Sequence, residues 1–146
     1  MGEQDAIAVV RRNVEAFNAG DWDGFAQTIA PDGVYEEPAT QRRVVGVQEN
    51  IALAKGWKTA FPDVKGTITN AFASGDNVTV EITWQGTHTG PLEGPMGTIP
   101  ATGKRITVKS VQVARLEGGK AKENRQYFDL LGMLAQLGVL PAPAAV

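Results

Sequence analysis

A few side chains in this sequence have the types that acid–base chemistry needs. His88 is the only histidine, and an imidazole titrates near neutral pH, where it can transfer protons. Glu36 and Glu37 are adjacent, so in an extended segment one carboxylate points inward. We take His88 and Glu37 as candidate general acids or bases. The alternatives are a hydrogen-bonded core position for His88 and a solvated edge segment for Glu37.

Three amide side chains lie near the end of the chain, at Gln112, Asn124 and Gln126. Period-two alternation predicts that they face one interior from two neighbouring strands. Buried amides need hydrogen-bond partners, so these three either satisfy one another or orient a carbonyl or hydroxyl group of a substrate. Asp129 follows closely and is a third candidate acid, although its place before an apolar helix favours an N-cap.

Three aromatic residues, Trp57, Phe61 and Trp84, fall on the apolar sides of predicted elements. Such residues usually belong to the core, but they also line cavities in which apolar ligands bind. We include them as candidate substrate contacts. No second histidine or carboxylate cluster accompanies His88, so a metal site is not expected.

Hydrophobic periodicity predicts the elements that position these residues. Helical spacing predicts helices at about 5–18 and 47–61, a short helix after Asp21 with the stripe Trp22, Phe25 and Ile29, and a last helix at 129–137. Alternation predicts a short extended piece at 34–37 and long strands near 64–72, 78–90, 104–116 and 121–128. A loop rich in glycine and proline, Pro91–Gly103, separates the middle strands. The order indicates an α+β fold with the helices on one face of the sheet.

Composition narrows the class of protein. With 146 residues the chain is expected to form one domain, with a core at about 5–138 and a tail at 139–146. A net charge of −2 favours neither nucleic acid nor an anionic membrane as a partner. Cysteine is absent, and neither a signal peptide nor an apolar run of membrane-spanning length is evident. We therefore expect a cytoplasmic protein.

Several segments together match one pattern. They are Ala16-Phe-Asn-Ala-Gly-Asp21, Tyr35-Glu-Glu-Pro-Ala39, Phe61-Pro-Asp63, Trp84-Gln-Gly-Thr-His-Thr-Gly90, Ala101-Thr-Gly-Lys104, Asp129-Leu-Leu-Gly and Gln136-Leu-Gly138. In this order and spacing, from about Ile7 to Gly138, the chain resembles the SnoaL-like polyketide cyclases, or ester cyclases, of the nuclear transport factor two-like superfamily.

This resemblance implies a cone-shaped α+β barrel, in which a curved antiparallel sheet wraps around the N-terminal helices and leaves an apolar pocket. It implies a homodimer formed through the convex face of the sheet, and chemistry without metal or organic cofactor. The implied ligand is a small, apolar, aromatic polyketide-like compound. The implied reaction is an aldol ring closure of a polyketide ester in secondary metabolism, with one acidic residue exchanging protons with the substrate.

The chain departs from the family pattern at two positions. Gln126 stands where the catalytic aspartate of the family is expected, and Gln112 stands where a histidine is expected. A glutamine neither gives nor takes a proton at neutral pH, so an acid or base has to be sought at His88 or Glu37. Two hypotheses follow: a cofactor-independent cyclase or isomerase-type enzyme acting on an apolar carbonyl compound, and a non-catalytic ligand-binding or dimerisation module of the same fold.

Overall fold

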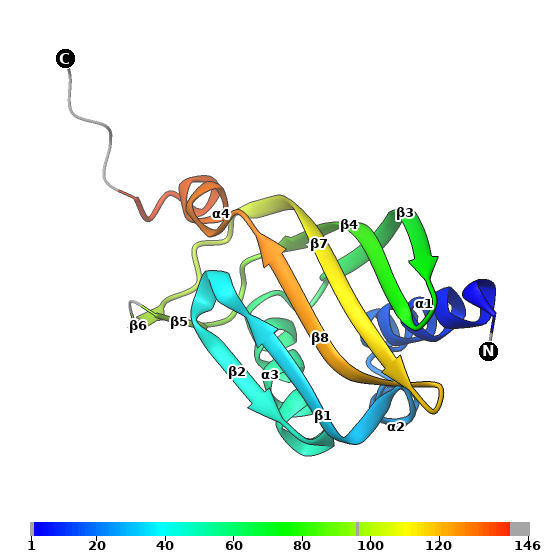
Figure 1. Ribbon diagram of the computed structural model, residues 1–146. Coiled ribbons are helices and arrows are strands. Elements are labelled where there is room, and N and C mark those ends of the chain that lie inside the picture. The colour runs from blue at the N-terminus through cyan, green and yellow to red at the C-terminus, as the bar shows by residue number, and fades with distance from the viewer. Residues whose placement is uncertain (1, 96, 141–146) are drawn as a thin grey trace.

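The computed structural model describes residues 2–95 and 97–140, so the predicted tail is described only at 139–140 and its remainder, 141–146, lies outside. The elements, in chain order (Figure 1), are α1 (Glu3–Ala19), α2 (Trp22–Gln27), β1 (Ile29–Glu37), the 3₁₀ helix η1 (Pro38–Thr40), β2 (Arg42–Val45), α3 (Val47–Ala60), β3 (Lys65–Ser74), β4 (Asn77–Thr87), β5 (Leu92–Gly94), β6 (Gly97–Ile99), β7 (Arg105–Glu117), β8 (Lys120–Phe128) and α4 (Leu130–Leu137). Helices α1, α2 and α3 lie on one face of a curved sheet, as the order of elements predicts.

The main sheet has six strands in the order β2-β1-β8-β7-β4-β3. Its pairings are antiparallel except for β1 with β8, which is parallel. The prediction of an antiparallel sheet therefore needs a correction at this one pairing. Parallel neighbours need a long connection, and the chain between β1 and β8 supplies one. Alternation within a strand carries no information about the direction of its neighbour, so the pattern did not reveal it.

Local signals account for the first two helices. Gly20 ends α1 in the left-handed conformation with φ 68°, which glycine adopts without the steric cost that a side chain brings. The Asp21 carboxylate then accepts a hydrogen bond from the Gly24 N–H at 3.0 Å and caps α2. The predicted extent of this helix is wrong, because Ile29 begins β1. Its side chain is buried all the same, which explains why it fitted a helical stripe.

Two clusters of buried apolar side chains form the core. One joins α1 to the inner face of β3, β4 and β7 around Val10, Val78 and Leu116. The other joins Phe17, Phe61 and side chains of α3, α4, β5 and β7. None of the helices in the described residues is long and apolar enough to cross a membrane.

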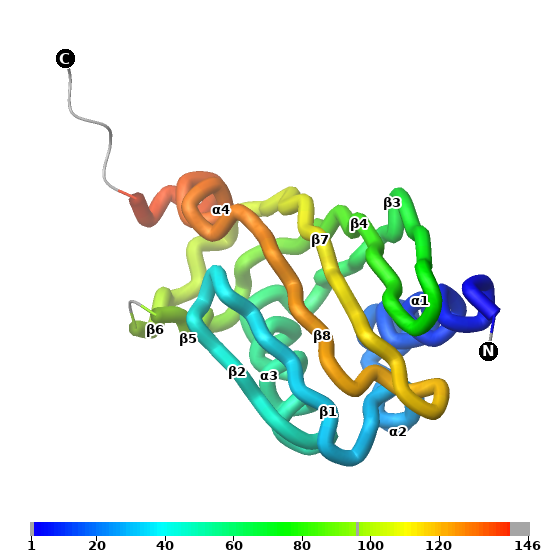
Figure 2. Tube along the Cα trace, in the orientation of Figure 1, coloured from blue at the N-terminus to red at the C-terminus, as the bar shows by residue number. Residues whose placement is uncertain are grey.

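The predicted loop at 91–103 contains a short hairpin, in which β5 pairs antiparallel with β6. The hairpin and α4 lie toward the same end of the sheet (Figure 2). Leu92 of β5 and Met133 and Leu137 of α4 belong to the same buried cluster. Helix α4 is held there by Leu137, which is 1% exposed, whereas Leu131 on the same helix is 66% exposed.

We predict that Leu137→Ala lowers the free energy of unfolding by about 2–5 kcal/mol, because it removes buried methyl groups and leaves a cavity. Leu131→Ala is the matched control and should change it by less than about 0.5 kcal/mol. Urea denaturation of both variants measures the difference. Equal effects would show that α4 is not packed against the core as described.

Candidate active site

The inner face of the sheet and the helices enclose an apolar cavity with a volume of about 120 Å³. Glu37 is the one charged residue among the described residues that line it. Six other residues singled out from the sequence also line it, namely Trp57, Phe61, Trp84, Gln112, Asn124 and Gln126. Most of the remaining lining side chains are apolar, so the cavity suits a neutral ligand with a few polar groups.

The Glu37 carboxylate has no exposed surface and accepts hydrogen bonds from four side chains. Its Oε1 accepts from Thr40 Oγ1 at 2.6 Å and from Arg42 Nη2 at 3.0 Å. Its Oε2 accepts from Tyr35 Oη at 2.8 Å and from Trp57 Nε1 at 3.0 Å. Burial of a carboxylate costs several kcal/mol unless it is paired and hydrogen-bonded, and these four donors meet that requirement.

A chain of hydrogen bonds continues from Glu37 through Tyr35 to Gln126. Gln126 Nε2 donates to Tyr35 Oη at 2.8 Å, and Gln126 Oε1 accepts from Trp84 Nε1 and Ser110 Oγ, both at 3.0 Å. Burial, and next the charge of Glu37, raise the pKa of Tyr35 well above its usual value. Tyr35 therefore stays a neutral phenol near pH 7 and donates its proton to Glu37.

Close packing positions the Trp84 indole in this wall. Trp84 lies opposite Gly66 in the pairing of β3 with β4, and a Cβ on Gly66 would come within 2.5 Å of the indole ring. The missing side chain lets the ring pack closely against β3 at Gly66. The ring also meets Phe17 edge to face, with ring centroids 5.3 Å apart. The indole N–H is thereby directed at Ser110 and Gln126.

Gln112 and Asn124 differ from Gln126. Gln112 is 5% exposed and lines the cavity without a side-chain hydrogen bond among the described residues. The Asn124 Oδ1 is buried and has no hydrogen-bond partner in the described part of the chain. Of the three amides predicted to face one interior, one is thus tied to the protein and two are not.

His88 and Asp129 are not among the residues that line the cavity. The His88 ring is fully buried behind Phe61, with ring centroids 5.2 Å apart, and its Nδ1 accepts a hydrogen bond from the Thr102 backbone N–H at 3.2 Å. Asp129 caps α4, where its carboxylate accepts from the Gly132 N–H at 2.9 Å. The structure therefore brings Glu37 and the amides together and leaves these two residues outside.

The sequence analysis missed the residues that surround Glu37, namely Tyr35, Thr40 and Arg42. One signal was available, because Tyr35 and Glu37 are two residues apart and two-residue spacing puts side chains on one face of a strand. Thr40 and Arg42 gave no such signal. Their contacts depend on η1, which turns the chain back so that β2 pairs with β1.

The His88 environment predicts how stability depends on pH. Burial lowers the pKa of His88 below its usual 6.5, so the unfolded chain binds a proton at a higher pH than the folded one. Stability is then fully present above pH 6.5 and is lost as pH falls through and below that value. Nuclear magnetic resonance titration of this single histidine should give a midpoint below 6.5 with the proton on Nε2, and the urea midpoint should fall between pH 7.5 and 5.5. A midpoint at or above 6.5 would contradict the burial.

The chain is similar to known proteins over most of its length. Residues 7–137 match the family described as SnoaL-like polyketide cyclase. Over 134 residues the chain is 31% identical to the aklanonic acid methyl ester cyclase DauD of Streptomyces sp. strain C5. The aligned region covers 90% of this chain and 81% of that protein. Over 128 residues it is 30% identical to the nogalonic acid methyl ester cyclase of Streptomyces nogalater, covering 86% of this chain and 91% of that protein.

Solved structures confirm the predicted fold class. A putative SnoaL-like polyketide cyclase from Jannaschia sp. CCS1 superposes with a TM-score of 0.84 at 25% sequence identity, over 95% of this chain and 95% of that one. TsrD from Streptomyces laurentii superposes with a TM-score of 0.82 at 26% sequence identity, over 96% of this chain and 99% of that one. The family match covers nearly all of the described chain, and the cavity lies within it. This chain belongs to the SnoaL-like polyketide cyclase family.

Proposed function

We propose that this protein is a cofactor-independent enzyme that closes a ring in an apolar polyketide-type ester by proton transfer, with Glu37 as the group that takes and returns the proton. One observation carries the proposal: a carboxylate without exposed surface borders a cavity that is otherwise uncharged among its described lining residues. Family membership supports a cyclase role, and the two relatives are named as an aklanonic acid methyl ester cyclase and a nogalonic acid methyl ester cyclase.

The proposed reaction balances without a co-reactant. Once one of its four hydrogen-bond donors has moved away, Glu37 takes a proton from a carbon that lies next to a carbonyl group, and the C–H electron pair moves into the enolate. The enolate carbon attacks a second carbonyl carbon of the same molecule, which forms the new C–C bond and an alkoxide. Protonated Glu37 then returns the proton to the alkoxide oxygen, and the carboxylate is restored.

Gln126 is proposed to stabilise the enolate oxygen. Its Nε2 carries two N–H bonds, and the contact with Tyr35 uses one of them. The bonds to Trp84, Ser110 and Tyr35 fix the amide plane, so the second N–H is preorganised toward a developing negative charge. In this proposal Gln126 occupies the position of the family aspartate but only donates a hydrogen bond to the enolate oxygen. Glu37 takes over the role of the base.

A specific observation favours the alternative of a non-catalytic binding module. Each oxygen of Glu37 already accepts two hydrogen bonds, so one donor must move before the carboxylate accepts a proton. A module of this kind would hold an apolar ligand and leave it unchanged.

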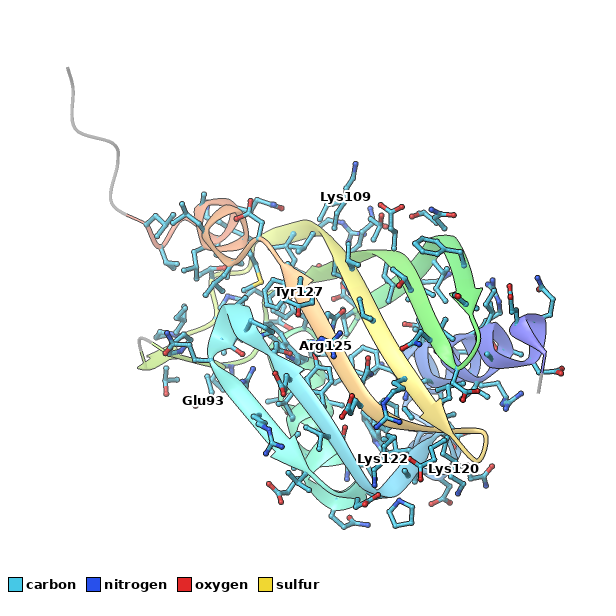
Figure 3. The ribbon with its side chains drawn as sticks, in the orientation of Figure 1. Glu93, Lys109, Lys120, Lys122, Arg125 and Tyr127 are labelled. Carbon is cyan, nitrogen blue, oxygen red and sulfur yellow. The ribbon has the colours of Figure 1, made fainter. Side chains whose placement is uncertain are left out.

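We also propose that the protein forms a homodimer through the outer, convex face of the sheet. On β8, Arg125 and Tyr127 project from the face opposite the helices (Figure 3). Tyr127 is 44% exposed and Val111 on the neighbouring β7 is 36% exposed. Apolar side chains of this size on a sheet face are common where two proteins meet.

Glu37→Gln is predicted to lower kcat by about 10²–10⁴ on aklanonic or nogalonic acid methyl ester, because the general base is lost. Glu36→Gln is the matched control, because the Glu36 carboxylate is 43% exposed and pairs with Arg43 at the surface. It should keep wild-type turnover. Full turnover by a folded Glu37→Gln variant would remove the assigned role.

Gln126→Asp separates the enzyme from the binding module. An aspartate is one methylene shorter and carries no N–H group, so in the enzyme it should lower kcat by about 10²-fold through loss of the oriented donor. If the wild-type protein converts neither ester and Gln126→Asp creates turnover, the chain is a binding module that has lost its acid. Chromatography of the products distinguishes the two results.

A further inference from the structure

The amides of Gln112 and Asn124 take no part in the hydrogen-bond network around Gln126. All three side chains face the cavity from β7 and β8. Gln112 lies directly opposite Gln126, and Asn124 lies opposite Ala114, one diagonal step from Gln112. Diagonal neighbours on a sheet are roughly 7 Å apart. Two amide groups at that spacing can each reach a different oxygen of one ligand.

Gln112 and Asn124 differ from Gln126 in their hydrogen bonding to the protein. Three protein groups hold Gln126 in place, while neither Gln112 nor Asn124 has a protein partner among the described residues. The Asn124 Oδ1 is buried without a partner among the described residues, and a buried polar group left unpaired costs about 1–3 kcal/mol, so keeping it in an apolar cavity lowers stability. Such a cost is typical of a binding site that awaits its ligand.

We propose that Gln112 and Asn124 form the subsite that recognises a neutral ligand carrying a hydroxyl group close to a carbonyl group. The Asn124 Oδ1 accepts a hydrogen bond from the ligand hydroxyl, and the Gln112 amide N–H donates to the ligand carbonyl. This inference specifies the substrate class of the proposed enzyme and rests on that proposal for the identity of the site.

The subsite also predicts which ligands are rejected. No cation lines the cavity among the described residues, and Glu37 carries a negative charge in the same wall. A ligand without a hydroxyl or carbonyl group leaves the two amides unpaired, so it gains none of the affinity that these hydrogen bonds would contribute. Recognition is therefore by uncharged oxygen atoms and by the pattern of donor and acceptor they present.

Simple bicyclic probes test the subsite without any need for turnover. Equilibrium dialysis compares 1-naphthol with naphthalene, and 1-tetralone with tetralin, so that each pair differs in one oxygen. The wild-type protein should bind each oxygen-bearing probe about tenfold more tightly, as one buried hydrogen bond contributes. Asn124→Leu should abolish the preference for 1-naphthol, and Gln112→Leu should abolish the preference for 1-tetralone.

Stability provides a second and independent measurement. Asn124→Leu should leave the urea midpoint unchanged or raise it, because no bond within the protein is lost. Gln126→Leu, on the same face of β8, breaks three hydrogen bonds and should lower the midpoint. Asn124→Ala adds no bulk and serves as the second variant in case Asn124→Leu misfolds. It should also lose the naphthol preference.

The opposite results overturn the inference. They are an equal affinity of the wild-type protein for the two probes of a pair, as amides satisfied by water alone would give, or a naphthol preference that survives in both Asn124 variants. Either result leaves the Glu37 proposal standing, because that proposal is judged by kcat. Conversely, loss of the Glu37 role would not alter the probe affinities, so the two failures are distinguishable.

Discussion

The burial of the Glu37 carboxylate is the constraint on which the rest of the site depends. A charge without exposed surface needs several donors at once, and the four that serve it come from β1, η1, β2 and α3. These elements are therefore held in one arrangement by a single anion. The hydrogen-bond network extends further. Tyr35 accepts a hydrogen bond from Gln126, and Gln126 accepts hydrogen bonds from side chains of β4 and β7.

This network divides the cavity wall into a fixed part and a responsive part. Around Glu37 and Gln126 nearly every polar atom is committed to another protein group, which preorganises the wall for a charge that develops in a reaction. Gln112 and Asn124 remain available for a ligand. The apolar remainder of the cavity lining comes from the same cluster that stabilises the fold, so residues such as Phe61 and Trp57 pack in the core and also line the cavity.

The sequence predicted much of the fold and part of the site, for identifiable reasons. Alternation on β7 and β8 placed Gln112, Asn124 and Gln126 on one face correctly, because period two is a local property. The parallel pairing of β1 with β8 and the donors Thr40 and Arg42 depend on contacts between distant or turning segments, which no local pattern encodes. His88 had the right chemistry for a catalytic residue, but packing behind Phe61 decides its position, and packing is not visible in spacing.

Transfer of the substrate proton to Glu37 is the central claim, and hydrogen–deuterium exchange measures it most directly. An aryl β-keto methyl ester that lacks the further carbonyl group attacked in ring closure can enolise in the cavity but cannot close a ring. In D₂O the wild-type protein and Glu36→Gln should both accelerate deuterium uptake at the carbon between the carbonyls, and Glu37→Gln should bind the ester without accelerating it. Equal acceleration by Glu37→Gln would contradict the account.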